Sequence, residues 1–266
     1  MTSRILTTAA AATLALGLAA CGSDKGNDKA DGALDTITAG TLTVCSDVPY
    51  PPFEDFDKTT PTGFKGFDID IVTAVAKELK LKLVVKDSDF NALQSGLALN
   101  SRQCDLAASA MTITPVREKK IGFSEGYYDS EQSLLVPAGS SIKSIDDLKG
   151  KSVAVQKGTT GETYANKNAT GAKVTSFPSD AQMYAAIKAG QVDAILQDLP
   201  VNLDHQKDPK QPGKFTVVET YKTDETYGLA MKKSNTDLIK AVDDALATLH
   251  SSGDYQKIYD SYFATK

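Results

Sequence analysis

The chain has 266 residues, of which 41% are hydrophobic, so it can form one large domain or two lobes with separate cores. Its formal net charge is −5 and no basic patch stands out, which argues against a nucleic-acid partner and against electrostatic binding to a membrane surface. The two histidines, His205 and His250, lie far apart and show no metal-ligand spacing, so we expect no metal site and no cofactor.

The first twenty residues are expected to be a signal peptide. Arg4 precedes an apolar, alanine-rich segment, Ile5–Ala20, that is too short for a convincing membrane span. The segment ends in Leu18-Ala19-Ala20-Cys21, which resembles the lipobox of bacterial lipoproteins and implies cleavage before Cys21 and acylation of that cysteine. An ordinary signal peptide followed by a chance cysteine is the alternative. Residues 21–35 are mostly small or polar and read as a flexible tether, which places the body outside the cytoplasm on a lipid anchor.

The body then alternates strands and helices. The first half is predicted to hold a strand at Thr41–Cys45, a helix at Ile71–Leu79 capped by Asp68, a strand at Leu81–Val85, a helix at Ala92–Leu99 and a strand at Asp105–Ala110. Between the first strand and helix, three prolines stiffen a loop and hold Tyr50 and Phe53 in place. This βαβαβ order predicts parallel strands with right-handed crossovers.

A second unit of the same kind follows. Its predicted strands are Leu134–Val136, Lys151–Val155, Val174–Phe177, Val192–Leu196, Thr216–Glu219 and Tyr227–Met231, and its predicted helices are Ser144–Leu148, Glu162–Lys167, Ala181–Ala189, one after Pro200, Thr236–Leu249 and Tyr255–Phe263. Two α/β units in tandem indicate two lobes. Ligands of such sheets bind beyond the carboxyl ends of the strands, so a cleft between the lobes would bring those ends face to face.

A candidate anion receptor follows the strand at Asp105–Ala110. Thr114 is a natural N-cap and Pro115 suits the first turn of a helix, which would let Arg117 point back toward the strand end. Together with Thr112 and the free N–H groups of the helix, this guanidinium could bind a carboxylate. The alternative is a solvated surface arginine beside a threonine that only caps a helix.

The second unit supplies a candidate cation receptor. Asp198 ends a predicted strand, although it could instead cap the helix before Pro200. Gly158-Thr159-Thr160 adds N–H and hydroxyl donors before another helix. An anion receptor opposite a cation receptor suits a zwitterionic amino acid. Three aromatic residues (Tyr50, Phe53 and Phe90) could form the walls of its side-chain pocket, with Asp47 beside them as an acceptor.

Two cysteines remain in the body, Cys45 and Cys104, and an oxidising compartment would permit a disulfide between them. The expected strand register argues against it. In neighbouring parallel strands their Cα atoms would be offset by about three residues, or about 10 Å, which is beyond disulfide reach. Two free thiols are the alternative.

Several motifs, taken in order, resemble the family 3 solute-binding proteins of ABC importers for polar amino acids. They are PYPPF, GFDIDI, SAMTITPVREKKIGFSEGYY, LKGKSVAVQKGTTGETY, AGQVDAILQD and YGLAMKK. The resemblance implies an α/β, two-lobed periplasmic-binding-protein-like fold, with two doubly wound sheets joined by a two-strand hinge near Asp129–Gln132 and Asp224–Tyr227. Residues 36–131 and 226–266 would then form lobe 1, and residues 132–225 lobe 2.

The same resemblance implies the site residues. Arg117, Thr112 and Thr160 would hold the ligand carboxylate, while Asp198 and the backbone of Ala110 would hold the amino group. Asp47, Tyr50, Phe90 and Gln156 would line the side-chain pocket. Ala110 stands where some relatives have serine or glycine, and Gln156 where others have lysine or an apolar residue, so the particular amino acid stays open. Asp47 and Gln156 favour a polar ligand, basic or amide, although Lys157 weakens this expectation.

The function expected from these features is a monomeric, lipid-anchored receptor that closes on an L-amino acid and docks on a membrane permease. Two alternatives belong to other classes. An enzyme resembling cyclohexadienyl dehydratases would need a general acid or base, and only Asp47 or Asp198 is placed to serve. A ligand sensor would signal to a membrane partner instead of feeding a transporter.

Overall fold

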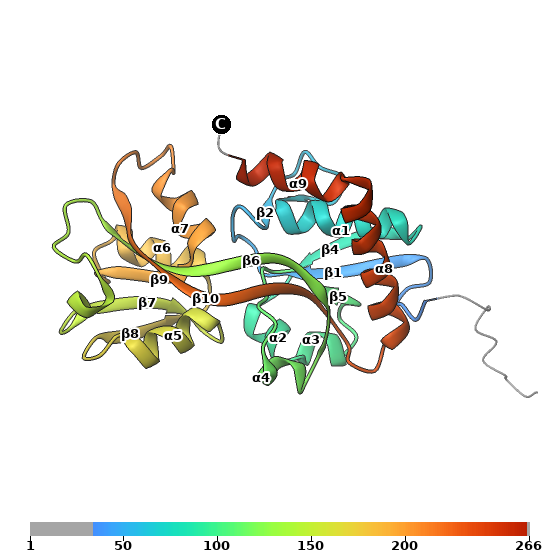
Figure 1. Ribbon diagram of the computed structural model, residues 1–266, viewed down its shortest axis with the longest axis horizontal. Helices are drawn as coiled ribbons and strands as arrows, with labels where there is room; N and C mark the ends of the chain where they lie inside the picture. Colours follow the sequence, from blue (N-terminus) through green and yellow to red (C-terminus); the bar gives the residue numbers. More distant parts are fainter. Residues whose placement is uncertain (1–33, 265–266) are drawn as a thin grey trace, which may run out of the picture. The chain divides into compact units, whose positions relative to one another are not determined.

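The structure is a computed structural model that describes residues 34–264 (Figure 1). In this part of the chain, eight strands form one sheet in the order β4-β1-β5-β10-β6-β9-β7-β8, and β2 (Asp55–Phe56) pairs separately with β3 (Phe64–Lys65). The strands of the large sheet are β1 (Thr41–Ser46), β4 (Lys82–Asp87), β5 (Leu106–Ala107), β6 (Gly122–Pro137), β7 (Ser152–Gln156), β8 (Lys173–Phe177), β9 (Ala194–Asp198) and β10 (Phe215–Met231). The predicted lipidation site, Cys21, lies outside the described residues.

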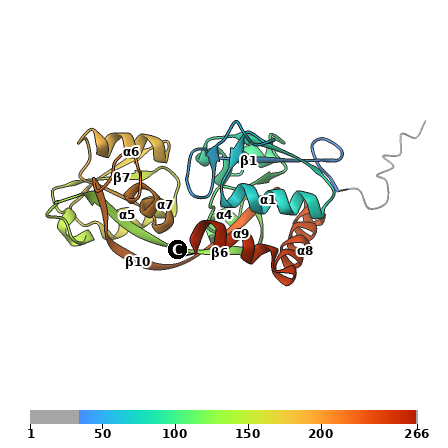
Figure 2. The ribbon, with the colours of Figure 1, turned by 90° about the horizontal axis from the view of Figure 1, so that it is seen from above.

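Two long antiparallel strands, β6 and β10, run through the middle of the sheet (Figures 1 and 2). On one side, β5 pairs with β10, and β1 pairs in parallel with both β5 and β4. On the other side, β9 pairs with β6, and β7 pairs in parallel with β9 and β8. We call the group with β1, β4 and β5 lobe 1 and the group with β7, β8 and β9 lobe 2. The predicted α/β fold of two lobes joined by two strands is confirmed, but the two expected sheets are one continuous sheet, because β10 pairs with β5 and β6 pairs with β9.

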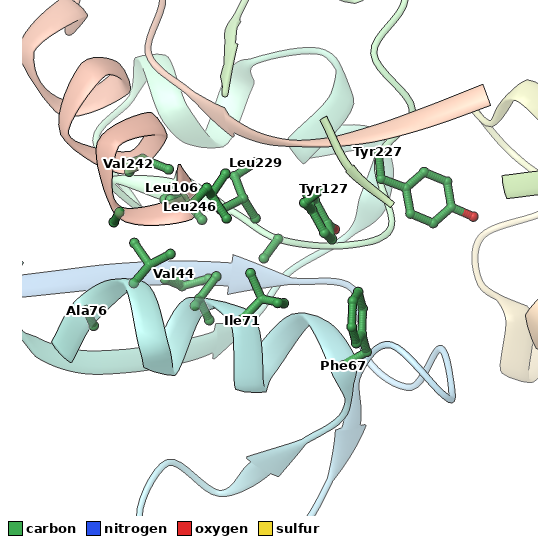
Figure 3. Close-up of a cluster of buried hydrophobic side chains, with 14 of the residues drawn as sticks. Val44, Phe67, Ile71, Ala76, Leu106, Tyr127, Tyr227, Leu229, Val242 and Leu246 are labelled. Carbon is green, nitrogen blue, oxygen red and sulfur yellow. The ribbon is translucent and has the colours of Figure 1, made fainter. Parts of the chain in front are cut away.

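Lobe 1 has a core on each face of its strands. Helices α1 (Phe67–Glu78) and α8 (Thr236–Ser252) pack on one face, where Figure 3 shows Val242 and Leu246 of α8 near Leu106 of β5. The buried residues of α8 fall at helical spacing, which is why this segment folds as an amphipathic helix. Each fully buried aliphatic side chain contributes about 1.5–3 kcal/mol relative to an exposed one. The remaining helices are α2 (Phe90–Gln94), α3 (Leu97–Asn100), α4 (Pro115–Glu118), α5 (Thr160–Asn168), α6 (Asp180–Lys188), α7 (Leu199–Gln206), α9 (Asp254–Phe263) and a 3-10 helix at Ile145–Leu148.

Lobe 2 also buries both faces of its strands. In β7, Val153 and Val155 contribute to a cluster with Ala165 of α5, whereas Ala154 contributes to a different cluster with Met183 of α6. This division follows from the period of two in a strand, which sends successive side chains to opposite faces. Both lobes therefore hold their strand ends rigidly, and the loops after those ends are where a site can be built.

Some local predictions were wrong. Asp68 does not cap α1, because the helix already begins at Phe67 and the N-cap is Gly66. The Asp68 carboxylate is fully buried and accepts hydrogen bonds from the Ala110 N–H and the Tyr127 hydroxyl, each at 2.8 Å. The helix expected at residues 92–99 is broken at Gly96, whose φ of 80° is a left-handed conformation that glycine adopts without strain.

Cys45 and Cys104 form a disulfide with a Cα–Cα distance of 5.8 Å, contrary to the register argument. The register itself is as expected, because Cys45 lies opposite Ala107, three residues after Cys104. The error lies in the length of the strand. β5 contains only Leu106 and Ala107, so the chain before it is bent and brings Cys104 back toward β1. Within the described residues, no helix is long and apolar enough to cross a membrane.

Candidate ligand-binding site

The nine residues that the family resemblance assigned to the ligand all line one cavity between the lobes, whereas Phe53, also expected in the wall, is fully buried in the core of lobe 1. The walls of the cavity are Asp47, Tyr50, Phe90, Ser109, Ala110, Thr112, Arg117, Gln156, Thr159, Thr160 and Asp198. The cavity volume is about 20 Å³, which is room for about one water molecule and far below the about 300–1,000 Å³ of a small-molecule site. The walls therefore lie close together.

Arg117 is held in the cavity by its own helix. The Thr114 side chain accepts a hydrogen bond from the Arg117 N–H and Pro115 occupies the first turn, as predicted. The guanidinium donates to the Thr112 carbonyl at 2.7 Å and to the Gly158 carbonyl of lobe 2 at 3.0 Å. Arg117 is 4% exposed, which rules out a solvated surface arginine. Burial lowers the pKa of Arg117 to about 10, so the group stays positively charged at neutral pH.

The cavity is closed on one side by Phe90, the first residue of α2. The carbon centre of the Arg117 guanidinium lies 5.3 Å from the centre of the Phe90 ring, within the range of a cation–π contact. Asp89 places this ring, because its side chain caps α2 by accepting from the Ala92 N–H. A guanidinium with five donors uses two of them on carbonyls here, so it retains donors for an anionic ligand group.

Asp198, at the end of β9, occupies the N-cap position of α7, but its side chain makes no capping hydrogen bond. Instead, it accepts from the Tyr50 hydroxyl of lobe 1 at 2.8 Å and from the Gln132 amide of β6. Burial raises the pKa of Asp198 to about 7, and the negative charge of Glu225 adds to this effect. A carboxyl of this kind gains from a nearby cation, because a positive charge offsets the cost of burying the carboxylate.

At another part of the wall, Asp47 of lobe 1 meets Gln156 of lobe 2. The Gln156 amide donates to the Asp47 carboxylate and, at 3.1 Å, to the Pro178 carbonyl. Burial raises the pKa of Asp47 to about 7, against the opposing effect of the Gln156 hydrogen bond. The structure thus contains a second, partly buried acceptor besides Asp198, with an amide facing it.

Ala110 stands in the wall with a φ of 43°, which is strained for a residue other than glycine. Its N–H is committed to Asp68, so the backbone carbonyl is the group that Ala110 can offer to a ligand. Next to it, Ser109 donates to the buried carboxyl of Glu54 at 2.7 Å and accepts from the Asp47 N–H at 3.0 Å. The sequence indicated Ser109 as a polar residue at the end of a strand but did not assign it to the site, and it gave no signal for Glu54.

The two threonines expected to hold the ligand carboxylate have a different partner in the structure. The hydroxyls of Thr112 in lobe 1 and Thr160 in lobe 2 each donate to the Glu225 carboxylate at 2.7 Å. Gln132 of β6 donates to the same carboxylate at 3.1 Å. The family resemblance placed Gln132 and Glu225 in the two expected hinge segments, but it assigned neither to the site, because only the fold of β6 and β10 brings them there.

Comparison with known proteins places the chain in a family. Residues 42–265 match the bacterial extracellular solute-binding proteins, family 3. The chain belongs to this family. It is 33% identical over 260 residues to a probable histidine-binding protein from Neisseria gonorrhoeae, covering 96% of this chain and 94% of the relative. It is 32% identical over 261 residues to an ABC transporter glutamine-binding protein from Bacillus subtilis (strain 168), covering 92% of this chain and 91% of the relative.

Among solved structures, an ancestral arginine-binding protein bound to arginine has a TM-score of 0.78 and 37% sequence identity. The likeness covers 85% of this chain and 99% of that one. The family expected from the sequence motifs is therefore confirmed, and this family 3 protein functions as a solute-binding receptor. In residues 34–264, no group of three or more His, Cys, Asp or Glu side chains is arranged to hold a metal ion.

Proposed function

We propose that this family 3 protein captures a polar L-amino acid, basic or amide, in the cavity between its lobes and presents it to an ABC permease. The observation that carries the proposal is the pairing of a buried guanidinium, Arg117, with a buried carboxyl, Asp198, on the walls of one cavity. An amino acid carries both complementary charges. The Arg117 guanidinium would hold its carboxylate, while Asp198 and the Ala110 carbonyl would hold its ammonium group.

The chemistry of the remaining wall supports the choice of side chain. Asp47 can accept a hydrogen bond or an ion pair from the ligand, and Gln156 can turn either its carbonyl or its amide toward it. Tyr50 and Phe90 supply apolar surface for the carbon chain of the ligand. The relatives named for histidine, glutamine and arginine support a ligand of this class.

Binding would proceed by closure of the lobes, with β6 and β10 as the hinge. We assign residues 36–131 and 226–266 to lobe 1 and residues 132–225 to lobe 2. Contacts such as Tyr50 to Asp198 and Arg117 to Gly158 cross between the lobes, so they form only when the lobes are together. A ligand that touches both walls would add to these contacts and shift the population toward the closed form.

The setting we propose is a monomer outside the cytoplasm, anchored to the cell membrane by a lipid on Cys21 after removal of the signal peptide at residues 1–20. Residues 21–35 would form the tether. An ABC permease would be the partner, and the Bacillus subtilis relative, which is named as an ABC transporter glutamine-binding protein, supports this proposal. A receptor that signals to a membrane partner would bind its ligand in the same cavity, so only the identity of the partner protein distinguishes a sensor from a transport receptor.

Catalysis is the second candidate function, because Asp47 and Asp198 have pKa values near 7 and could move a proton. We propose binding without turnover, since the same raised pKa values follow from burying two carboxyls where a cationic ligand would sit. The transport roles of the relatives agree with this choice. Incubation with a prephenate-like acid tests it, and conversion of that acid would favour an enzyme.

The direct test is a thermal-shift screen of the twenty L-amino acids, because a ligand that binds only the folded state raises the melting temperature. We expect a clear shift with basic or amide side chains. Arg117→Ala and Asp198→Ala should abolish it, whereas Arg102→Ala, at an exposed arginine away from the cavity, should leave it intact. No shift with any amino acid would contradict the proposal.

A further inference from the structure

Glu225 lies where both lobes and the hinge meet. It belongs to β10, is 7% exposed, and its carboxylate accepts hydrogen bonds from Thr112 of lobe 1, Thr160 of lobe 2 and Gln132 of β6. The two threonine hydroxyls share one carboxylate oxygen and the Gln132 amide uses the other. The Glu225 side chain therefore links three segments, one from lobe 1, one from lobe 2 and one from the hinge strand β6.

The local backbone explains why this glutamate turns inward. Between the pairs Tyr221–Gln132 and Glu225–Ser130, β10 carries Lys222, Thr223 and Asp224 whereas β6 carries only one residue. Asp224 has a φ of 50°, an uncommon left-handed conformation. A bulge of this kind re-aims the side chain that follows it. Here it directs the Glu225 carboxylate into the protein, beside the ligand cavity.

The hydrogen bonds of Glu225 limit what the threonines can do. A hydroxyl has one proton, and both Thr112 and Thr160 give theirs to this carboxylate. In the closed arrangement their hydroxyls can therefore offer only lone pairs to a ligand. An anionic ligand group has to be held by Arg117 and by backbone N–H groups instead.

Glu225 could alternatively act as an internal competitor that occupies the carboxylate position of the ligand. The contacts of Arg117 argue against this role. Its guanidinium donates to the carbonyls of Thr112 and Gly158 and makes no hydrogen bond to Glu225. If Glu225 occupied the carboxylate position of the ligand, it should pair with the Arg117 guanidinium, because arginine–carboxylate pairs form strong, charge-assisted hydrogen bonds.

From this geometry we propose that Glu225 is a positioning residue that stabilises the closed arrangement of the lobes. This inference rests on the proposed function. Glu225 receives one hydroxyl proton from each lobe, so both bonds to it exist only when the lobes are together. Opening the lobes must break at least one of them. The ligand then benefits indirectly, because its release requires the same opening.

The test is Glu225→Gln, which keeps the shape of the side chain but removes its negative charge, so the hydrogen bonds from Thr112 and Thr160 are broken or lose their charge assistance. Asp224→Asn is the matched control: it removes one negative charge from the adjacent residue, whose side chain is exposed and makes no hydrogen bond within the described residues. Asparagine also tolerates the left-handed backbone there. The probe ligand is L-arginine.

We expect Glu225→Gln to bind L-arginine at least about tenfold more weakly, with a faster dissociation rate and an association rate close to that of the wild type. Asp224→Asn should bind like the wild type. A merely structural role would lower the melting temperature without this division between the two rates. Equal or tighter binding by Glu225→Gln would overturn the proposal, and tighter binding would identify Glu225 as a competitor.

A double-mutant cycle with Thr112→Val sharpens the test. If the Thr112 hydroxyl serves Glu225, the losses caused by Thr112→Val and Glu225→Gln overlap and the double variant is little worse than either single one. If the hydroxyl serves the ligand carboxylate directly, the two losses add and the proposal is wrong.

A measurement without ligand separates this proposal from the proposed function. Spin labels at Glu78→Cys on lobe 1 and Lys188→Cys on lobe 2 report the distance between the lobes, and both sites are exposed. We expect a smaller closed fraction in Glu225→Gln than in the wild type or Asp224→Asn. Equal closed fractions would overturn the role of Glu225. Failure of L-arginine to bind the wild type would count against the ligand assignment alone.

Discussion

Acidification should weaken the binding of a cationic amino acid, because two carboxyls of the cavity titrate near neutrality. Asp198 and Asp47 both have their pKa raised to about 7, mainly by burial. A protonated carboxyl cannot form an ion pair with the ligand. The bound cation favours the charged form, so binding should release protons wherever these groups are protonated in the free protein.

The magnitude follows from the two pKa values. A carboxyl with a pKa of about 7 is about nine-tenths ionised at pH 8 and about one-tenth ionised at pH 6. If the ligand binds only the ionised form, each carboxyl lowers the affinity about tenfold between these pH values. L-Arginine has an ammonium group for Asp198 and a guanidinium for Asp47, so the two effects together predict a loss of about a hundredfold.

Isothermal titration calorimetry at pH 6, 7 and 8, in two buffers of different ionisation enthalpy, measures the affinity and the number of protons released. Asp198→Asn should bind more weakly overall and retain only about a tenfold pH dependence, from Asp47 alone. Affinity that is the same at pH 6 and pH 8, with no proton release, would refute the assignment of these carboxyls to the ligand.

The folding stability of the free protein should show the opposite dependence on pH. The folded-state pKa of each carboxyl lies above its ordinary value of 3.8, so the folded state binds more protons than the unfolded state between about pH 4 and pH 7. The contribution of these two groups to stability therefore falls as the pH rises through that window and is constant above it.

Three further predictions concern single features. Arg117→Lys keeps the charge but loses the planar fork, so we expect L-arginine to bind at least about tenfold more weakly by calorimetry, and unchanged affinity would contradict the role of Arg117. Replacing Cys45 and Cys104 by serine opens a cross-link between residues 59 apart and should lower the unfolding free energy by about 4 kcal/mol in urea titrations. A Cβ at Gly66, where φ is 126°, would lie 2.1 Å from the Phe53 carbonyl oxygen, so Gly66→Ala should cost about 2–4 kcal/mol, and a wild-type melting temperature would show that the loop can move.

Much of the candidate site could be predicted because its signals are local in the chain. The Thr114 cap, Pro115 and Arg117 form one helix start, and Asp198 directly ends a strand. The period of two in strands and the caps of helices act over a few residues, so a short sequence is enough to recognise them. The ends of parallel strands lie at the same edge of a sheet, which is why residues far apart in the chain could be assigned to one cavity.

The features that were missed depend on contacts between distant segments. Thr112 and Glu225 are 113 residues apart, and Asp68 meets Ala110 across 42 residues. The disulfide was misjudged because β5 is only two residues long, and its length is set by its neighbours in the sheet more than by its own residues.

The sequence by itself therefore determined the family, the α/β order of the two lobes and most of the residues that line the cavity between them, because hydrophobic period, caps and strand ends are properties of short segments. Only the tertiary structure decided which acceptor takes the protons of Thr112 and Thr160, where Asp68 is buried, and that Cys45 reaches Cys104. A side chain can form hydrogen bonds only with groups that folding brings within about 3 Å, so its partner is determined only once the chain has folded.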